Sequence, residues 1–365
     1  MFSWHEKDWN SLAARLQQLP HALLIQGPPG TGIEAFAFTL AEALMCERRT
    51  SQGWACGACQ ACNWFAQGNH PDFRLVQPES LDSTEAGEGA EGAEGGEAAA
   101  PAAKKEKKKS DQIRVEQIRA LQDFLAIGTH RAGNRVVLVR PAEAMNVTTQ
   151  NALLKSLEEP PPATVFILVI SHPARLLPTV RSRCQRIVLG QPDTQQALDW
   201  LLTQDPQQPL SRDDWGQLLA QGGGAPVAAL EARQHEAARN GFVRLLRDGR
   251  PEVLASADAT QGLPPALLVA WLQRWVYDLL RARLGTPVRY HLAEAPLLAQ
   301  LAARCDPIAL TRLLRSLGDS LRLAEHPLNA RLFAEDLFIR YREVFVVNAL
   351  AGGPRRSSAS FSASR

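Results

Sequence analysis

Three largely apolar runs, separated by turn residues and longer polar segments, organise the first half of the chain. They span Ala22–Ile25, Arg135–Val139 and Val165–Ile170. Short continuous runs of this kind are typical of parallel strands that helices cover on both faces. A glycine-rich turn follows the first run, and Ala35–Leu44 after it has the composition of a helix. The pattern predicts an α/β domain built on a parallel sheet.

Apolar residues at helical spacing flank these runs. Trp4–Leu19 ends at Pro20 and is expected to be a helix that covers one edge of the domain, and a second helix is expected from Ile113 onward. The apolar positions on their faces are Leu12, Leu16 and Leu19 in the first and Ile118, Leu121 and Leu125 in the second.

Beyond residue 190 the pattern is wholly helical. Residues 191–250 predict a small helical lid domain, interrupted by the glycines at 222–224, and residues 251–349 predict an all-α domain. In the latter, apolar residues from Leu267 to Leu279 recur at i, i+4 and i+8, which is typical of a bundle core; part of this face is also a candidate interface. Residues 1–190 form the first domain. Residues 350–365 are rich in Gly, Ser and Arg without periodicity and are expected to be a disordered tail.

Composition adds limits. The 365 residues exceed what one core usually organises, and 45% hydrophobic with 21% charged residues is an ordinary globular balance. No membrane span and no export signal is visible, so we expect a cytoplasmic protein. The net charge of +2 does not by itself indicate a polyanionic partner.

The glycine-rich turn has the shape of a phosphate-binding loop but lacks two of its chemical groups. In the pattern G-x-x-x-x-G-K-[ST], backbone N–H groups surround the phosphates, the Lys neutralises them and the Ser/Thr hydroxyl binds Mg²⁺. Ile33 and Glu34 occupy those last two positions. We therefore expect an inherited turn that holds no ATP. The loop positions that would face a phosphate are Gly27, Gly30, Thr31 and Gly32.

The second strand lacks the usual catalytic carboxylates as well. In a nucleoside triphosphatase such a strand ends in an Asp that binds Mg²⁺, often with a Glu that positions water. Here it ends in Arg140 and Pro141. Glu143 is a possible substitute, but it lies three residues past the strand and is expected to face solvent. Ser171 follows the third strand and is expected to be a turn residue.

Four of the six cysteines lie together at the spacing C-x9-C-x2-C-x2-C. They are Cys46, Cys56, Cys59 and Cys62. In a reducing compartment this clustering favours a closed tetrahedral zinc site with a structural role, because no position is left open for water. Unliganded thiols, or a redox pair at the last two cysteines, are the alternatives. Cys184 and Cys305 are expected to be buried small residues.

A low-complexity insertion spans about 79–110. Glu, Gly and Ala alternate in its first part, and the run Lys104–Lys109 ends it. Nothing in this segment can bury a core, so we expect it to be disordered. The lysines either contact DNA phosphates or belong to a solvated linker.

Three ordered motifs together carry a family resemblance. They are the loop Pro28–Gly32, the segment Asn151–Pro161 and the run Pro178–Cys184, joined by the cysteine cluster after the first helix. With these motifs the chain resembles the delta-prime subunits of the bacterial DNA polymerase III clamp loader, within the AAA+ family. The resemblance is strong over residues 20–190 outside the insertion and weak over 190–350.

The resemblance implies a function in DNA replication. Members of this family work in a hetero-pentamer with delta and gamma/tau subunits, which opens a sliding clamp and closes it around primer–template DNA. Their C-terminal helices form a collar, and the delta-prime subunit itself does not hydrolyse ATP.

Arg183 is the residue that the resemblance marks as an arginine finger for the nucleotide of a neighbouring ATPase subunit. A planar guanidinium supplied in trans stabilises charge on the transferred phosphate and makes hydrolysis depend on assembly. The alternatives are that Arg183 pairs with a carboxylate of its own chain, or that Arg181 has this role.

Two further positions are compared through the resemblance. Lys155 lies on a helix that in the family is near the DNA, so it either contacts a phosphate or pairs with Glu158 or Glu159. Val227 stands, in a loose alignment, where hydrolysing members carry a nucleotide-sensing Arg.

Two other classes of function stay open. An active AAA+ ATPase would bind Mg-ATP through backbone amides alone. A zinc-dependent nucleic-acid-binding protein would use the cysteine cluster as its contact, although Arg48 and Arg49 are the only cations near it in sequence.

Overall fold

The computed structural model describes residues 1–81, 110–126, 133–204, 209–324 and 329–350. The predicted insertion and the C-terminal tail lie almost wholly outside these ranges. The chain divides into two compact units, residues 1–196 and 197–365. In the described ranges, no helix is both long and apolar enough to cross a lipid bilayer.

A five-stranded parallel sheet forms the centre of the first unit. Its order is β2-β3-β4-β1-β5, so the three strands predicted from the apolar runs lie side by side in its middle. β1 pairs with β4 from Ala22 opposite Phe166 to Gln26 opposite Ile170. The strands span Ala22–Gln26 (β1), Phe73–Val76 (β2), Arg135–Val139 (β3), Thr164–Ile170 (β4) and Gln185–Val188 (β5).

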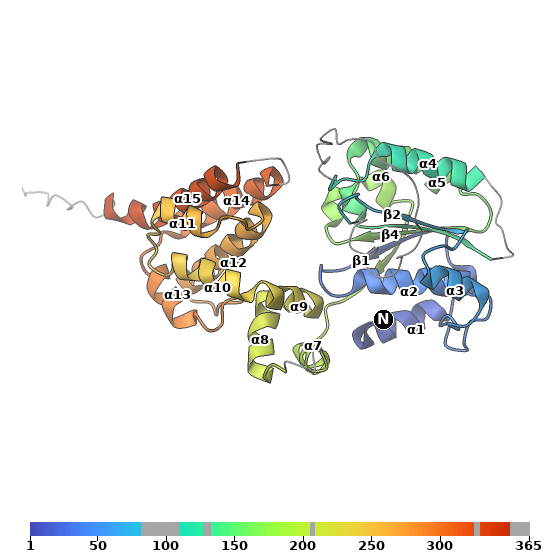
Figure 1. Cartoon of the computed structure of the whole chain (residues 1–365), viewed down its shortest axis with the longest axis horizontal. Coiled ribbons are helices and arrows are strands. Elements are labelled where there is room, and N and C mark those ends of the chain that lie inside the picture. Colours follow the sequence, from blue (N-terminus) through green and yellow to red (C-terminus); the bar gives the residue numbers. More distant parts are fainter. Residues whose placement is uncertain (82–109, 127–132, 205–208, 325–328, 351–365) are drawn as a thin grey trace, which may run out of the picture. The chain divides into compact units, whose positions relative to one another are not determined.

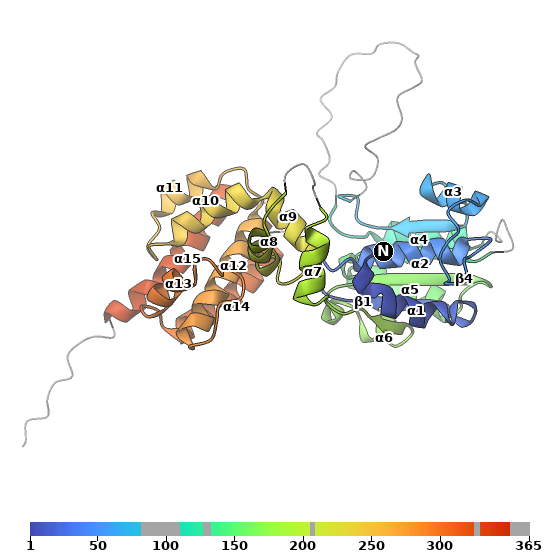
Figure 2. The same ribbon diagram turned by 90° about the horizontal axis from the view of Figure 1, so that it is seen from below.

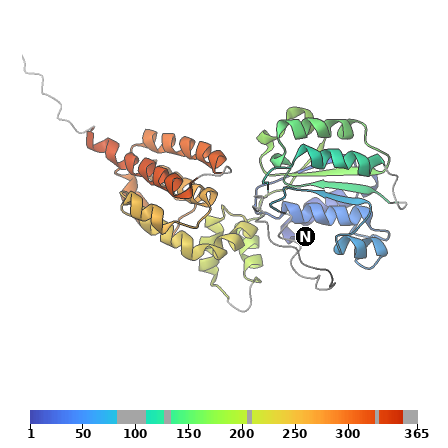
Figure 3. The same ribbon diagram turned by 45° about the horizontal axis from the view of Figure 1, so that its top comes forward.

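Helices cover both faces of this sheet (Figure 1). On one face lie α1 (Glu6–Ala13), α2 (Ile33–Met45) and α3 (Gln60–Ala66); on the other lie α4 (Val115–Ala126), α5 (Val147–Glu158) and α6 (Pro178–Arg181). Figure 3 shows the same sandwich, with blue helices on one side of the sheet and green helices on the other. Alternate residues of each central strand enter two separate apolar clusters, which explains why these strands read as continuous apolar runs.

Two predicted helices differ in their boundaries. The helix expected over Trp4–Leu19 is broken into α1 and two short 3-10 turns, Ser3–His5 and Leu16–Gln18. The helix expected from Ile113 begins two residues later, because Ile113 itself forms a parallel bridge with Met145.

Three helices follow the sheet domain: α7 (Thr194–Leu201), α8 (Arg212–Gln221) and α9 (Pro226–Gln234). They share a small apolar cluster centred on Trp215. The glycine break lies where the sequence predicts it, since α8 ends at Gln221 and the glycines at 223 and 224 have φ of 71° and 89°.

The remaining helices form one bundle (Figure 2). They are α10 (Glu236–Leu246), α11 (Val253–Ala259), α12 (Pro265–Arg283), α13 (Ala295–Ala302), α14 (Pro307–Leu323) and α15 (Ala330–Leu350). The aromatic stripe of α12 lies in the bundle core: Trp275 is fully buried, and its Nε1 donates to the hydroxyl of Tyr341 at 2.9 Å. The buried residues of α10 also belong to this core, so the packing favours a lid boundary near residue 235. The boundary at 250 stays a prediction.

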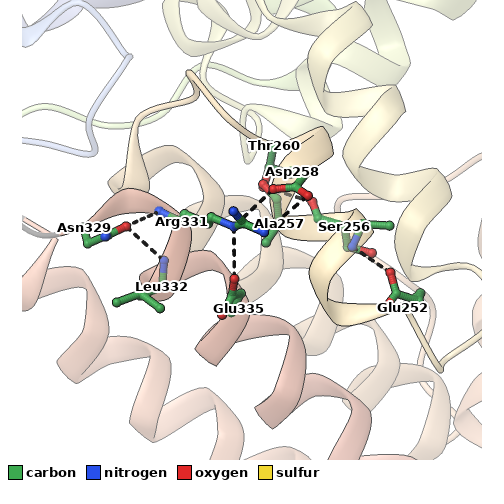
Figure 4. A network of polar contacts seen from close by, with 10 residues as sticks. Glu252, Ser256, Ala257, Asp258, Thr260, Asn329, Arg331, Leu332 and Glu335 are labelled. Carbon is green, nitrogen blue, oxygen red and sulfur yellow. Dashed lines mark hydrogen bonds and ion pairs between the residues drawn. The ribbon is translucent and has the colours of Figure 1, made fainter.

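An ion-pair network fastens the start of α15 to α11 (Figure 4). The Nε atom of Arg331 lies 3.1 Å from Asp258 and 3.2 Å from Glu335, and Asn329 Oδ1 accepts the backbone N–H groups of Arg331 and Leu332. Arg331 and Asp258 are about half exposed, and Glu335 is 19% exposed. Each pair therefore contributes on the order of 0.2–1 kcal/mol.

Candidate functional site

The glycine-rich turn joins β1 to α2 and keeps the backbone of a phosphate loop. Gly30 and Gly32 have φ of 74° and 86°, a left-handed conformation that favours glycine, and Gly32 caps the N-terminus of α2. Thr31 is fully buried, and its hydroxyl donates to the carbonyl oxygen of Pro28 at 2.7 Å. The hydroxyl is thus engaged within the loop itself.

Aromatic side chains from the N-terminus pack directly on this loop. Trp4 Nε1 donates to the carbonyl oxygen of Thr31 at 2.9 Å, and His5 Nε2 lies 2.9 Å from the same oxygen. The ring of Phe2 stacks on Trp4 with a centroid separation of 4.6 Å. A Cβ atom placed on Gly32 would lie 2.1 Å from the Phe2 ring. The outer side of the turn is therefore covered by the chain itself.

An ion pair joins the two positions at which a triphosphatase would hold Mg²⁺. Arg140 Nη1 lies 2.6 Å from Glu34 Oε2. Arg140 Nε donates to Gln77 Oε1 at 2.9 Å, and its guanidinium lies 4.9 Å from the centre of the Phe38 ring. The Arg140 side chain is only 11% exposed, whereas Glu34 is 46% exposed. A cation and its partner carboxylate thus occupy the two positions where metal ligands are needed.

Glu143 does not face solvent, so that prediction is wrong. Its side chain is 9% exposed, and Oε1 accepts the backbone N–H groups of Ser171 at 2.9 Å and His172 at 3.2 Å. The cause is topological: β3 and β4 are neighbours, so their carboxyl ends meet, and the 3-10 turn Ala142–Ala144 brings Glu143 to the end of β4. This carboxylate holds a turn.

The four clustered cysteines converge in space. Their sulfur atoms all lie within 4.8 Å of one another, with 3.9 Å between Cys46 and Cys59 and 3.5 Å between Cys59 and Cys62. A tetrahedral zinc ion with Zn–S bonds of about 2.3 Å sets its sulfurs about 3.8 Å apart. The donor set and its spacing therefore fit a metal ion of this kind.

The environment of the thiols differs across the cluster. Burial raises the pKa of Cys46 and Cys62. Backbone N–H groups lower the pKa of Cys56. Burial acts to raise the pKa of Cys59, but hydrogen bonds from backbone N–H groups, of which that of Cys62 has the largest effect, lower it to about 6. Four thiolates would repel one another at these distances, so a bound cation would be needed to hold them together.

In the part of the chain that the structure describes, the other two cysteines belong to no such cluster. Cys305 is fully buried, which confirms the prediction for it, and burial raises its pKa to about 12. Cys184 is only half-buried, and burial raises its pKa to about 11. Both thiols are protonated at neutral pH.

Arg183 lies two residues after the end of α6 and reaches back to the end of α5. Its Nη1 donates to the carbonyl oxygen of Thr179 at 2.8 Å, and its Nη2 forms an ion pair with Glu158. The Arg183 side chain is 34% exposed. The segment Asn151–Pro161 and the run Pro178–Cys184 are thus in contact. The alternative that Arg183 pairs with a carboxylate of its own chain is observed in this structure, with Glu158 as the partner. Arg181 is half-buried, and its Nε atom has no hydrogen-bond partner among the described residues.

Lys155 is exposed on α5, beside a shallow pocket of about 270 Å³ that Gln122 and Glu159 also line. Within the described part of the chain it forms no ion pair with Glu158 or Glu159, and Glu158 pairs with Arg183 instead. Val227 lies in the first turn of α9 and is half-buried.

Comparisons with known proteins identify the family. The model of the family described as "DNA polymerase III, delta subunit" matches residues 4–193. The chain is 35% identical to DNA polymerase III subunit delta' of Pseudomonas aeruginosa over 292 residues, which cover 78% of each chain. The chain belongs to the delta-prime family.

The match to this family extends over nearly the whole chain. The delta' subunit of Escherichia coli K12 is 30% identical over 353 residues, covering 93% of this chain and 94% of that subunit. A solved DNA polymerase III gamma subunit-related protein of Thermotoga maritima aligns with 93% of this chain and 99% of its own, at 16% identity and a TM-score of 0.46. The predicted α/β class, a parallel sheet with helices followed by an all-helical region, is confirmed.

Several residues at the loop could not be predicted as partners. Phe2, Trp4 and His5 reach the loop from the N-terminus, and Phe38 and Gln77 hold Arg140 in place. The only available signal was the unusual density of Trp and His in the first ten residues.

Proposed function

We propose that this chain acts as the non-hydrolysing delta-prime subunit of a clamp loader, which loads a sliding clamp onto primed DNA and supplies Arg183 to the nucleotide of a neighbouring ATPase subunit. The observation that carries the first part is the ion pair between Glu34 and Arg140. Membership of the delta-prime family supports the replication role.

The loss of hydrolysis follows from charge and position. Mg-ATP needs a Lys or Arg at its outer phosphates and oxygen ligands for the metal. At these positions the chain presents Ile33, Glu34 and Arg140. To admit a metal, Arg140 would have to leave Glu34, Gln77 and the face of Phe38. The rest of the fold is intact, so the domain acts as a scaffold.

Arg183 has the properties that a donated arginine needs. It is partly exposed, and hydrogen bonds at two points, to Thr179 and to Glu158, limit its rotamers. Glu158 is itself 47% exposed, so the ion pair is screened by solvent and the guanidinium can exchange it for a phosphate oxygen. On this account, Glu158 orients the finger in the free subunit.

The cysteine cluster is assigned a structural zinc ion. Cys46, Cys56, Cys59 and Cys62 would hold it with all four coordination positions filled by sulfur, and when bound the metal supplies folding free energy. Cys59 also caps α3, since its sulfur accepts the backbone N–H of Cys62. Metal binding would thereby fix the start of that helix.

The remaining assignments follow from family membership. We assign delta and gamma/tau subunits, the sliding clamp and primer–template DNA as partners, and a cytoplasmic location. Lys155 is the candidate for a DNA phosphate contact on α5, because it is exposed and makes no ion pair with its own helix among the described residues.

Nucleotide binding to the isolated full-length chain tests the non-hydrolysing assignment. With a fluorescent ATP analogue and Mg²⁺, we expect no saturable binding and no phosphate release. A matched gamma-type ATPase subunit is the positive control. Turnover by the isolated chain would contradict the assignment and favour an active ATPase. A separate measurement of DNA binding before and after removal of zinc tests the other alternative. Loss of DNA binding on removal of zinc, with the fold retained, would favour a zinc-dependent nucleic-acid-binding protein.

A further inference from the structure

A cluster of arginine and tyrosine side chains lies on the C-terminal helical unit. The rings of Tyr277 and Tyr290 meet edge to face with centroids 5.7 Å apart. The guanidinium carbons of Arg274 and Arg289 lie 5.7 Å and 5.5 Å from the centre of the Tyr290 ring, and that of Arg281 lies 5.9 Å from Tyr277. Three cations thus gather around two aromatic rings.

The loop that carries Arg289 and Tyr290 is held by a buried carboxylate. The carboxylate of Asp278 is fully buried and accepts the backbone N–H groups of Arg289 at 2.7 Å, Tyr290 at 3.0 Å and His291 at 2.8 Å. Arg281 Nε also donates to the carbonyl oxygen of Pro287 at 2.6 Å. The positions of Arg289 and Tyr290 are therefore set by the fold.

Among the residues that the structure describes, no carboxylate lies within ion-pair distance of the cations of the cluster. Within the described ranges, no ion pair joins the guanidinium of Arg274 or Arg289 to an acidic side chain, and the only hydrogen bond of the Arg289 guanidinium there is to the carbonyl oxygen of Gly223, at 3.4 Å. The carboxylate of Glu231 acts on Arg274 from beyond ion-pair distance, while burial lowers the pKa of Arg274.

A further buried cation interacts electrostatically with Arg274. Arg239 of α10 is 5% exposed, and its Nε and Nη1 atoms have no hydrogen-bond partner among the described residues. Glu294 and Glu236 act on Arg239 electrostatically, and Glu294 lies 4.0 Å from a different arginine, Arg247. Arg239 and Arg274 repel each other. Buried cationic nitrogen atoms without hydrogen-bond partners are costly, so an anion from outside would stabilise this arrangement.

The chemistry of the cluster selects phosphate among anions. A guanidinium that lies on an aromatic face keeps its planar N–H edge available, and that edge matches two phosphate oxygens. Because the rings also restrict the rotamers of the arginines, less conformational entropy is lost when a phosphate binds. Aromatic rings beside the cations can in addition contact bases.

We propose that this Arg–Tyr cluster, formed by Arg274, Tyr277, Arg281, Arg289 and Tyr290, binds the phosphate groups of a nucleic-acid strand. The cations come from α12 and from the loop after it, so they can contact successive phosphates of one strand. This contact lies beyond the proposed function, which assigns no role in DNA binding to the C-terminal helices.

The test measures binding of the full-length chain to a fluorescein-labelled oligothymidine by anisotropy, over a range of salt. The double variant Arg274→Gln/Arg289→Gln is compared with Arg312→Gln/Arg315→Gln. The latter removes the same charge from exposed positions of α14 outside the cluster. We expect the cluster variant to bind about tenfold or more weakly at low salt and to lower the salt slope by about 1.4, with a smaller change in the control.

Two outcomes would overturn the proposal. Equal losses in the two double variants would show general electrostatic attraction, and no binding by the wild-type chain would show that the cluster has another ligand. Competition with inorganic phosphate distinguishes a nucleic-acid ligand from a free small anion. Displacement of the strand only at high phosphate concentration supports a nucleic-acid site. Tight binding of inorganic phosphate alone indicates a site for a small anion.

A second readout does not depend on the stability of the variants. The wild-type chain is photo-crosslinked to an oligonucleotide that carries 5-iodouracil, and the crosslinked peptides are mapped by mass spectrometry. Crosslinks at Tyr277 or Tyr290 are expected. Crosslinks confined to the lysine run at 104–109, or to the sheet domain, would contradict the proposal.

Discussion

Arg140 and Glu34 form an ion pair across the place where related enzymes bind a metal ion, although they are 106 residues apart in sequence. The two partners differ in their surroundings. Arg140 is nearly buried, donates to Gln77 and lies over Phe38, whereas Glu34 is half exposed. The pair therefore depends more on the arginine than on the carboxylate.

This asymmetry predicts unequal effects of two substitutions. Glu34→Ala should lower the free energy of unfolding by less than about 1 kcal/mol, because its charge is screened by solvent. Arg140→Ala should cost about 2 kcal/mol or more, since the contacts with Gln77 and Phe38 are lost as well. Urea unfolding of both variants and of the double variant measures this. Equal costs would contradict the account of the pair.

The contact between Phe2 and Gly32 predicts an unusually sensitive glycine. Gly32→Ala should destabilise the chain by about 2–4 kcal/mol, because the new Cβ clashes with the Phe2 ring and also strains a left-handed residue. Gly68→Ala is the matched control: its φ of +71° is similar, but nothing lies within 4 Å of the added Cβ. We expect about 1 kcal/mol there. Thermal unfolding of the two variants should rank them in this order, and the reverse order would exclude a close fit of the N-terminus on the loop.

The cysteine cluster predicts that the chain binds zinc and that substitution of two of its cysteines abolishes this binding. Replacing Cys59 and Cys62 together by Ser should release one zinc ion per chain and lower the unfolding temperature, while contacts with the other clamp-loader subunits persist. Elemental analysis measures the zinc content, thermal unfolding measures the unfolding temperature, and size-exclusion chromatography measures the retained subunit contacts. Cys184→Ser is the control that should keep the metal. An unchanged zinc content in the double variant would refute the assignment.

The buried carboxylate of Asp278 predicts a specific pH dependence. Burial acts to raise its pKa, but the hydrogen bond from His291 and those from backbone N–H groups of the following loop outweigh burial, so its pKa is lowered in the folded chain. The stabilisation is therefore complete above the unfolded pKa of about 3.9 and is lost as the pH falls through the lower folded value.

Asp278→Asn gives the corresponding measurement. The variant should be about 2–3 kcal/mol less stable than the wild type at neutral pH, because it weakens a set of charge-assisted hydrogen bonds. The difference in unfolding free energy should stay constant down to about pH 5 and narrow below about pH 4. A difference that does not change with pH would show that packing, and not the charge of Asp278, holds the loop.

Local pattern predicted much of the sheet. The boundaries of β3 were predicted correctly because both faces of that strand are covered, which leaves an apolar run with defined ends. The four cysteines were also expected together, because their short spacing brings them close in almost any loop conformation.

Long-range contacts could not be predicted in the same way. The pairing of Arg140 with Glu34 and the burial of Glu143 depend on which strand ends are neighbours in the sheet. Local sequence patterns do not determine the strand order, so these contacts could not be predicted from them. The packing of α10 is a similar case, since its contacts in the C-terminal core are with α12 and α15; the lid boundary at 250 stays a prediction.

We expect Arg183 to complete the nucleotide site of a neighbouring subunit. The measurement is DNA- and clamp-stimulated ATP hydrolysis by a reconstituted clamp loader that contains this chain or its Arg183→Ala variant, with assembly checked separately. Arg186→Ala, an exposed arginine on β5, is the matched control. We expect a loss on the order of one ATP site's turnover for Arg183→Ala, with the complex intact and the control unchanged. Full turnover by the Arg183→Ala complex would contradict it and would leave this chain a structural role only.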